Sequence, residues 1–134
     1  MASFRVGIDV VPVNRVERSL RRFGDMFVRR FFTDGELGAM PKKDALHMAG
    51  RIAAKEACMK VLGAGWPQVP WTSLEILRDA TGRPVVRAGG RALATMKRLQ
   101  IKEISVSLSH DGGLALAVAL GVGEGQENDP GHER

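Results

Sequence analysis

Two acidic residues lie where apolar side chains are expected. Asp9 lies inside the β-branched run of residues 4–11, and Glu56 interrupts the apolar stripe of a predicted helix. A buried carboxylate is unfavourable unless it is paired, hydrogen-bonded or bound to a metal ion. From the residues alone, Asp9 is either a structural acceptor of backbone N–H groups or a metal ligand at the end of a strand.

Lys60 follows Glu56 by one helical turn and lies on the same stripe. In the simplest interpretation, the two side chains form an exposed ion pair that stabilises the helix by about 0.3 kcal/mol. If this face packs inward instead, Glu56 needs a partner or a bound metal ion.

One long helix must position both Glu56 and Lys60. Residues 44–65 are rich in Ala, Leu, Met, Lys and Glu, which favour helix formation. Asp44 can cap the start by accepting backbone N–H bonds, and Gly63 can end the helix in a left-handed turn. We therefore predict a single central helix around which the rest of the chain is organised.

The remaining patterns predict an α+β fold. Thr33 and Glu36 have the spacing of a capping box, and residues 114–122 are almost continuously apolar, as in a strand buried on both faces. In residues 101–109, Ile, Val and Leu alternate with serine, which is typical of a half-buried strand. The expected elements are strands over 4–11, 74–77, 85–86, 101–109 and 114–122 and helices over 13–23, 33–40, 44–63 and 91–99. This order predicts a mainly antiparallel sheet packed against a long central helix.

The length of 134 residues, with 44% hydrophobic and 26% charged residues, is that of one soluble domain. We place the domain at residues 1–122 and expect the polar tail, 123–134, to be disordered. No apolar run approaches the roughly 20 residues that cross a bilayer, and a signal-peptide pattern is absent, so we expect a cytoplasmic protein with no membrane partner. The single Cys58 is interpreted as a packed hydrophobe rather than a nucleophile, and His47 as a surface or core residue.

The domain is basic. Residues 1–120 hold 19 basic and 11 acidic residues, a net charge of +8, and the whole chain carries +5. Such a field attracts nucleic acid, anionic membranes, phosphorylated ligands or an acidic protein. Aromatic residues make up only 5% and Tyr is absent, which disfavours nucleic acid because base stacking needs aromatic rings. Four arginines gather on one face of the helix over 13–23, which is either solvated or docks an acidic partner helix: Arg15, Arg18, Arg21 and Arg22.

Four segments, in their order and spacing, resemble the holo-acyl-carrier-protein synthases, the small class of phosphopantetheinyl transferases. They are Gly7-Ile-Asp9-Val-Val, Phe32-Thr-Asp-Gly-Glu36, Arg51-Ile-Ala-Ala-Lys55-Glu56-Ala-Cys-Met-Lys60-Val-Leu-Gly63 and Ser105-Val-Ser-Leu-Ser109-His110. The resemblance covers residues from about 6 to 120 and implies the family's fold. It also implies transfer of 4′-phosphopantetheine from coenzyme A to a serine of an apo acyl or peptidyl carrier protein, which yields the holo carrier and adenosine 3′,5′-bisphosphate.

The same resemblance implies magnesium as a cofactor and coenzyme A as a co-substrate. Asp9 and Glu56 match the family's magnesium ligands, and Lys60 matches a lysine that reaches the phosphate, so these three are the expected catalytic residues. Carboxylate oxygens are the ligands that magnesium prefers, which would explain two acids in apolar surroundings. Either Glu56 or a water on the metal is implied to take the proton of the carrier serine.

Further residues match the family's coenzyme A site. Arg51 and Lys55 match positions near coenzyme A phosphates, and Ser109 and His110 match an element that lies against the nucleotide. A turn that a neighbouring subunit contributes is matched by Gly82-Arg83-Pro84. The resemblance thus implies a homotrimer with each active site between two subunits. Carrier proteins are acidic, so the arginine face is implied to hold the carrier's negatively charged helix.

The sequence departs from the family pattern at two places that do not touch the expected ligands. Pro12 stands where an acidic or polar residue is expected, and Cys58-Met59 replaces an aromatic and small pair. The carrier can belong to fatty acid, polyketide or peptide biosynthesis, and acyl-coenzyme A is neither predicted nor excluded as a substrate. The alternative to an enzyme is a non-catalytic basic module that binds an acidic protein or nucleic acid, with Asp9 in a structural role.

Overall fold

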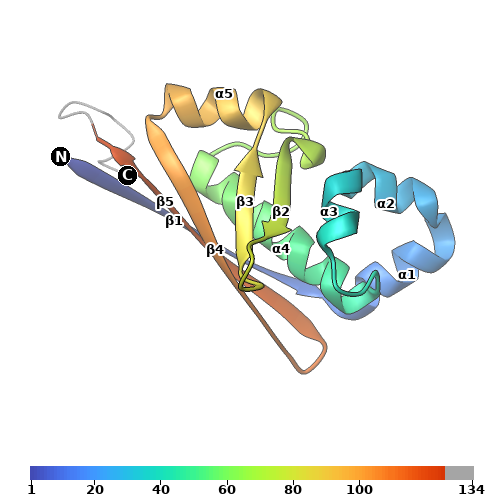
Figure 1. The fold of residues 1–134 in the computed structure, drawn as a ribbon. Coiled ribbons are helices and arrows are strands. Elements are labelled where there is room, and N and C mark those ends of the chain that lie inside the picture. The colour runs from blue at the N-terminus through green and yellow to red at the C-terminus, as the bar shows by residue number, and fades with distance from the viewer. Residues whose placement is uncertain (126–134) are drawn as a thin grey trace.

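One long helix lies across a three-stranded sheet in this protein (Figure 1). The computed structural model describes residues 1–125, so most of the predicted polar tail, from residue 126 onward, lies outside the described residues. The elements in chain order are β1 (Ala2–Pro12), α1 (Val13–Phe23), α2 (Asp25–Phe31), α3 (Asp34–Ala39), α4 (Ala45–Leu62), the 3-10 helix η1 (Trp71–Ser73), β2 (Leu74–Arg78), β3 (Pro84–Ala88), α5 (Gly90–Arg98), β4 (Ile101–Asp111) and β5 (Leu114–Glu124).

The strands form two antiparallel sheets. β5 is the central strand of the larger sheet, whose order is β1-β5-β4, and β2 and β3 form a separate hairpin. Because β5 pairs with β1 over its whole length, Asp9 of β1 lies opposite Ala117 of β5. The predicted α+β fold with a mainly antiparallel sheet is confirmed.

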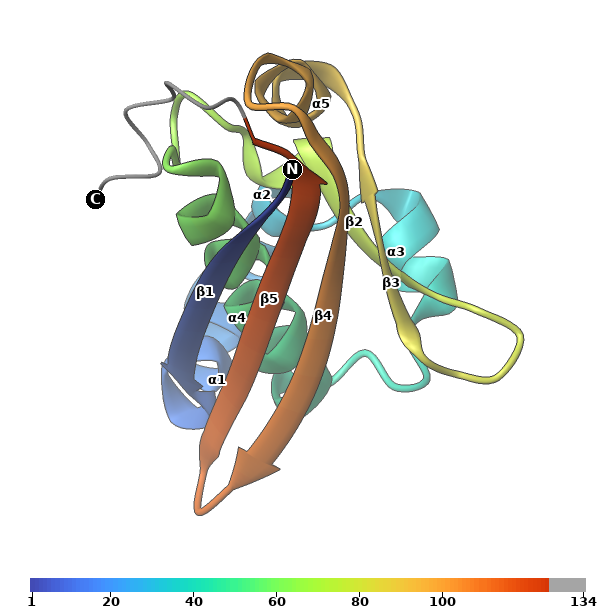
Figure 2. The same cartoon turned by 90° about the vertical axis from the view of Figure 1, so that its left-hand side faces the viewer.

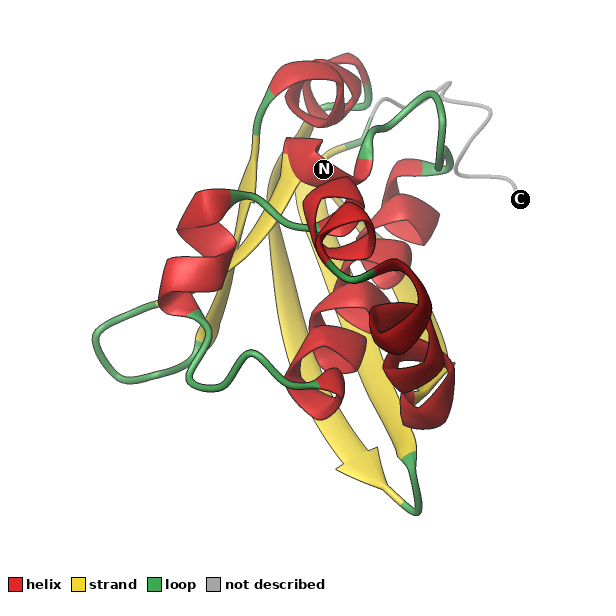
Figure 3. Cartoon of the chain, turned by 90° about the vertical axis from the view of Figure 1, so that its right-hand side faces the viewer, coloured by secondary structure: helices red, strands yellow, loops and turns green. Residues whose placement is uncertain are grey.

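Helix α4 forms the core between the sheet and helices α1 and α2. Figure 2 looks onto the three-stranded sheet with the helices behind it, and Figure 3 shows the helices from the opposite side. Twelve of the 18 residues of α4 are buried, as expected of the central helix. Its ends are those predicted, since Asp44 accepts a bond from the His47 N–H at 2.9 Å and Gly63 has a φ of +67°. No helix within residues 1–125 is both long and apolar enough to cross a membrane.

Cys58 lies in the middle of α4 and is fully buried. Burial is the main cause that raises the pKa of its thiol, to about 12. A thiol with that pKa stays protonated at neutral pH and is a poor nucleophile, so Cys58 is the packed hydrophobe predicted from the sequence.

The outer face of the three-stranded sheet is open within one chain. The sequence predicted β5 to be buried on both faces, and this is wrong for the single chain, because Val118 is 40% and Leu120 38% exposed. The β5 residues that face α4 are instead small and buried: Ala115, Ala117 and Ala119. On the same open face, β1 adds four exposed apolar side chains: Phe4, Val6, Ile8 and Val10. Beside them β4 places its serines outward, as its alternation predicted.

Candidate active site

Asp9 is the acid of β1 that faces α4. Side chains alternate along β1, so Gly7 and Val11 lie buried on the same side as Asp9, and Ile8 points to the open face. The Asp9 side chain is 15% exposed, and its Oδ2 atom is buried without a hydrogen-bond partner. Such an oxygen is unfavourable unless a cation or a proton approaches it.

Gly7 sets the close approach of β1 to α4. A Cβ atom on Gly7 would lie 2.0 Å from the backbone oxygen of Ala57 and 3.0 Å from Cβ of Lys60. A side chain at this position would therefore push the strand away from the helix. Two residues further along the same face of β1, Asp9 is brought beside Glu56 and Lys60.

Glu56 of α4 and Asp9 interact directly. Burial is the largest cause that raises the pKa of Glu56, and the hydrogen bond and negative charge of Asp9 raise it further, to about 8. The charges of Lys60 and Arg15 oppose the rise. With a pKa of about 8, the Glu56 carboxyl group is mostly protonated at neutral pH. The two acids singled out from distant parts of the sequence therefore converge in space.

Lys60 completes this group. Its Nζ donates to the backbone oxygen of Ile8 at 2.6 Å and lies 3.4 Å from Oδ1 of Asp9. The ion pair that Lys60 makes is thus with Asp9, whereas the sequence suggested Glu56 as the partner. The lysine side chain is 56% exposed, so its ammonium group is accessible to an anion that binds beside the two acids.

A cavity of about 480 Å³ joins the three residues, and we call it the acid-pair cavity. It is lined by Asp9, Glu56, Met59, Lys60, Gly63, Ala64, Gly65 and Trp71. The glycines after α4 keep the mouth free of side chains, so a ligand can approach the acids and the lysine together.

The donor set of this cavity suits a magnesium ion. Within residues 1–125, no cluster of three or more His, Cys, Asp or Glu side chains could hold a metal ion. Magnesium does not need one, because it is commonly bound by one or two carboxylates and keeps waters and substrate phosphate oxygens as its other ligands. The unpartnered Oδ2 of Asp9 and the raised pKa of Glu56 both mark a place where a cation would relieve unfavourable charge.

A second cavity, of about 450 Å³, lies between α1, α2 and α4 and shares Glu56 and Trp71 with the acid-pair cavity. Most of its walls are apolar or aromatic, including Phe27 and Phe31 of α2, and Arg15 and Arg30 also line it. We call it the α1–α2 cavity. A molecule bound on α1 can therefore reach Glu56 through an apolar passage.

The arginine face predicted from the sequence lies on α1 beside this cavity. All four of its arginines are exposed: Arg15, Arg18, Arg21 and Arg22. Arg15 lines the cavity and acts on the charge of Glu56, Arg21 pairs with Glu17, and Arg22 lies 5.2 Å from the ring centre of Phe23. A basic surface thus adjoins the acid pair.

Three of the predicted coenzyme A residues lie together at a place separate from the acid-pair cavity. Arg51, Ser109 and His110 line one small cavity of about 110 Å³ between α4 and β4, which we call the nucleotide notch. His47 lines it as well, with its Nδ1 held 2.7 Å from Oδ1 of Asp44. The sequence analysis missed His47, although its position one helical turn before Arg51 places both side chains on one face of α4. The notch shares no residue with the acid-pair cavity.

The turn between β2 and β3 carries Gly82 and Arg83, and it ends at Pro84, the first residue of β3. Asp79 orders this turn by accepting bonds from the N–H groups of Thr81 at 2.8 Å and of Arg83 at 3.1 Å, and Gly82 has a φ of +88°. None of the three turn residues lines the acid-pair cavity or the nucleotide notch. Within one chain the predicted coenzyme A residues other than Lys55 are therefore divided among three places.

The prediction made for Lys55 is wrong. The sequence analysis expected it near a coenzyme A phosphate, but its side chain is fully buried and forms an ion pair with Glu36. Its ammonium group has three N–H donors, and these are used by Oε1 of Glu36 and the backbone oxygens of Phe31 and Trp71. Lys55 has no donor left for a phosphate and no path to solvent.

Comparisons with known proteins identify the family of this chain. Residues 5–119 match the model of the 4′-phosphopantetheinyl transferase superfamily. The holo-[acyl-carrier-protein] synthase of Solidesulfovibrio magneticus is 45% identical over 116 residues, which cover 86% of this chain and 94% of that protein. The synthase of Gloeobacter violaceus is 39% identical over 123 residues, covering 89% and 92%. The crystal structure of the Helicobacter pylori synthase in complex with coenzyme A matches with a TM-score of 0.78 and 31% identity, over 87% of this chain and 98% of that one.

Proposed function

The chain belongs to the 4′-phosphopantetheinyl transferase superfamily, and we propose that the acid-pair cavity is its catalytic centre. The protein is a holo-acyl-carrier-protein synthase, which transfers 4′-phosphopantetheine from coenzyme A to a serine of an apo carrier protein. Adenosine 3′,5′-bisphosphate is the second product. The identity predicted by the resemblance is confirmed, and the non-catalytic binding module is no longer needed to explain the basic surface.

Asp9 and Glu56 would hold the magnesium ion. When bound, the ion supplies positive charge for the diphosphate of coenzyme A and for the leaving nucleotide. The observation that carries this proposal is the convergence of the two carboxyl groups, with Oδ2 of Asp9 buried and unpartnered. Lys60 supports it, because its ammonium group is held next to Asp9 by the backbone oxygen of Ile8 and its side chain is exposed to a ligand in the cavity.

In the transfer, the carrier serine oxygen forms a bond to the phosphorus that bears pantetheine. The bond from that phosphorus to the bridging oxygen of the nucleotide breaks, and the nucleotide leaves with the electron pair. Glu56 is placed to accept the serine proton, since it borders both the acid-pair cavity and the α1–α2 cavity. Lys60 stabilises the charge that develops on the leaving phosphate.

The carrier is proposed to dock on the arginine face. Arg15, Arg18 and Arg22 lie on the exposed side of α1, and Arg15 lies beside Glu56. An acidic helix that follows α1 would bring its serine to the mouth of the α1–α2 cavity. Complementary charge of this kind speeds association and fixes orientation.

We also propose a trimer in which two chains build each active site. The open face of the three-stranded sheet supports this, because a band of exposed apolar side chains of β1 and β5 is unusual for a monomer. The division of the coenzyme A residues supports it further. A single coenzyme A that contacts both the acid pair and the nucleotide notch can be held by two neighbouring chains, each of which supplies one of the two sets.

The direct test incubates the protein with coenzyme A, magnesium and apo carrier proteins from several pathways and measures the carrier's mass. We expect a gain of one phosphopantetheine, which a chelator prevents. Asp9→Asn and Glu56→Gln should each lower the rate by more than about tenfold, because each removes negative charge from the metal site. Asp34→Asn, at an exposed acid of α3, serves as the control and should leave the rate unchanged. An unchanged rate in Glu56→Gln would contradict the proposed centre.

A further inference from the structure

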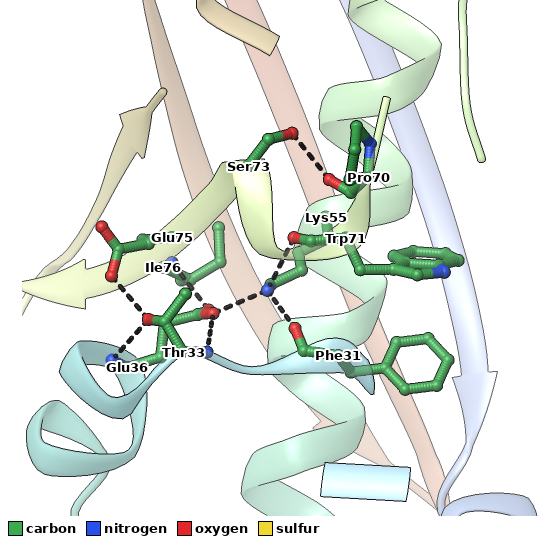
Figure 4. Close-up of polar contacts among 9 residues, drawn as sticks. All are labelled: Phe31, Thr33, Glu36, Lys55, Pro70, Trp71, Ser73, Glu75 and Ile76. Carbon is green, nitrogen blue, oxygen red and sulfur yellow. Dashed lines mark hydrogen bonds and ion pairs between the residues drawn. The ribbon is translucent and has the colours of Figure 1, made fainter. Parts of the chain in front are cut away.

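The buried ion pair between Glu36 and Lys55 is the most highly connected polar group among the described residues (Figure 4). Both side chains are 0% exposed, and Nζ of Lys55 lies 2.7 Å from Oε1 of Glu36. The same Nζ donates to the backbone oxygen of Phe31 and, at 3.0 Å, to that of Trp71. Lys55 thus ties α4 to the end of α2 and to the start of η1.

Glu36 extends the connection to α3 and β2. Its Oε1 accepts the Thr33 N–H at 3.1 Å, which completes the capping box of α3, and its Oε2 accepts the Ile76 N–H at 3.0 Å. The Thr33 hydroxyl in turn bonds Oε2 of Glu75 on β2. Burial raises the pKa of Glu36 and lowers that of Lys55, and each charge offsets the shift of the other.

Stability alone does not explain such a pair. Replacing a buried ion pair by apolar side chains of similar volume is often neutral or stabilising, because burying both charges is costly. What an apolar pair cannot do is bind the two backbone oxygens of Phe31 and Trp71. The specific contribution of Lys55 is therefore its hold on these two residues.

Phe31 and Trp71 form a wall beside Glu56. Their rings lie 4.8 Å apart between centres, both line the α1–α2 cavity, and Trp71 also lines the acid-pair cavity. Lys55 is the residue directly before Glu56 on α4. One ammonium group, that of Lys55, thus connects the backbone next to Glu56 with the backbone of the two aromatic residues.

We propose that the Glu36–Lys55 pair is a positioning device that fixes the Phe31–Trp71 wall relative to Glu56 and so shapes the passage by which the carrier serine reaches the acid pair. This inference rests on the proposed function. The pair touches neither coenzyme A nor the carrier, and it acts through Phe31 and Trp71. Its loss should affect the use of the carrier more than the binding of coenzyme A, whose phosphates are assigned to Lys60 and Arg51.

The test uses a Trp66→Phe background, in which Trp71 is the only tryptophan of the chain. In this background Lys55→Met and Glu36→Gln are combined, so that no unpaired charge is buried and the protein is expected to fold. We expect acrylamide to quench Trp71 more strongly than in the background. We also expect kcat/KM for the carrier to fall by about tenfold or more, with KM for coenzyme A changed by less than about twofold. A folded variant with unchanged quenching and unchanged carrier kinetics would overturn the proposal.

Trp71→Leu in the otherwise unaltered chain provides a second test, which decides the question if the double variant does not fold. It keeps the ion pair, because Lys55 binds the main chain of residue 71, and removes only the ring. The same loss in carrier kcat/KM with an unchanged KM for coenzyme A supports the inference, and kinetics equal to those of the unaltered chain overturn it. If the unaltered chain itself modifies no carrier, the proposed function fails, whereas the quenching comparison still reports whether the pair holds Trp71.

Discussion

The Glu56 carboxyl group, which lies beside Asp9, keeps a proton when no cation is bound next to it. Burial and the neighbouring acid raise the pKa of Glu56 to about 8, so the metal-free protein keeps this site partly protonated near neutral pH. In the proposed centre, a magnesium ion would take the place of that proton. If the proposed centre is correct, catalysis, metal affinity and stability should all depend on pH through Glu56.

The thermal stability of the metal-free protein should fall as the pH rises. The folded chain holds the Glu56 proton up to about pH 8, whereas an unfolded glutamate loses it near its ordinary pKa of about 4.3. Between these values the folded state binds more protons, so each step up in pH favours unfolding. Melting temperatures measured from pH 6 to 9 should fall more steeply in the unaltered protein than in Glu56→Gln. Added magnesium should raise the melting temperature most at the highest pH. Parallel pH profiles for the two proteins would contradict the link between the Glu56 proton and stability.

At the same scale, sequence reasoning singled out Asp9, Glu56 and Lys60 because charged residues in apolar patterns are conspicuous. The structure brings these three side chains to one cavity, and their catalytic role stays a prediction. Sequence reasoning misplaced Lys55, which belongs to the same matched segment as Arg51 and Glu56. Helical spacing predicts the face of the helix on which a lysine lies, but it does not predict which residues of other elements pack against that face. The partner, Glu36, is 19 residues earlier and had already been assigned to a capping box, which the structure confirms as only one of its roles.

At the scale of the elements, the site depends on how closely β1 lies against α4. Gly7 meets the backbone of Ala57, and the small side chains of β5 lie beneath the same helix. The caps and length of α4 and the alternation of β4 were predictable, because they follow from local sequence. The close contact of β1 with α4 was not predictable. Gly7 lies in a strand pattern, and that pattern does not show which element packs across the strand.

Gly7→Ala should destabilise the protein and inactivate it together. The new Cβ atom would meet the Ala57 oxygen at 2.0 Å, and neither backbone can yield without moving Asp9 away from Glu56. We expect a loss of at least about 2 kcal/mol in the free energy of unfolding, measured with urea. Gly38→Ala is the matched control, because nothing lies within 4 Å of a Cβ atom there and alanine favours the helix. Equal stabilities of the two variants would contradict this packing.

Charge reversal on α1 should weaken the carrier interaction selectively. Arg18→Glu places a negative charge in the middle of the arginine face, where it would repel an acidic carrier helix. We expect KM for the carrier to rise by about tenfold and its dependence on salt to weaken, with kcat preserved. Lys97→Glu, on the exposed side of α5, should leave carrier kinetics unaltered. An equal effect of the two reversals would indicate that net charge, rather than the arginine face, governs binding.

At the scale of the whole molecule, one chain presents the residues proposed to bind coenzyme A on separate surfaces. The acid-pair cavity and the nucleotide notch lie against different sides of α4, and the open face of the sheet offers apolar area for assembly. The apolar run of β5 predicted burial on both faces, which a single chain does not provide. An apolar run predicts that its side chains are buried. It does not predict whether the surface that covers them belongs to the same chain.

Two variants that are inactive for different reasons should regain activity when their chains are combined in mixed oligomers. Glu56→Gln removes an acid-pair ligand, and Arg51→Ala removes the cation of the nucleotide notch. In randomly mixed trimers with sites shared between chains, about one quarter of the sites would combine an intact Glu56 with an intact Arg51. Co-expressed chains should therefore regain about a quarter of the normal rate. No recovery in mixed trimers would place both residues of each site on one chain.

The proposed catalytic centre requires one divalent cation held jointly by Asp9 and Glu56, and the position of this ion can be measured directly. Crystals grown with coenzyme A and soaked in manganese, an anomalous scatterer that substitutes for magnesium, would locate the ion. We predict one anomalous peak per chain, at about 2.1 Å from a carboxylate oxygen of each acid and adjacent to the diphosphate. Bound coenzyme A with no peak at these two carboxylates, or with the ion held by other residues, would contradict the account.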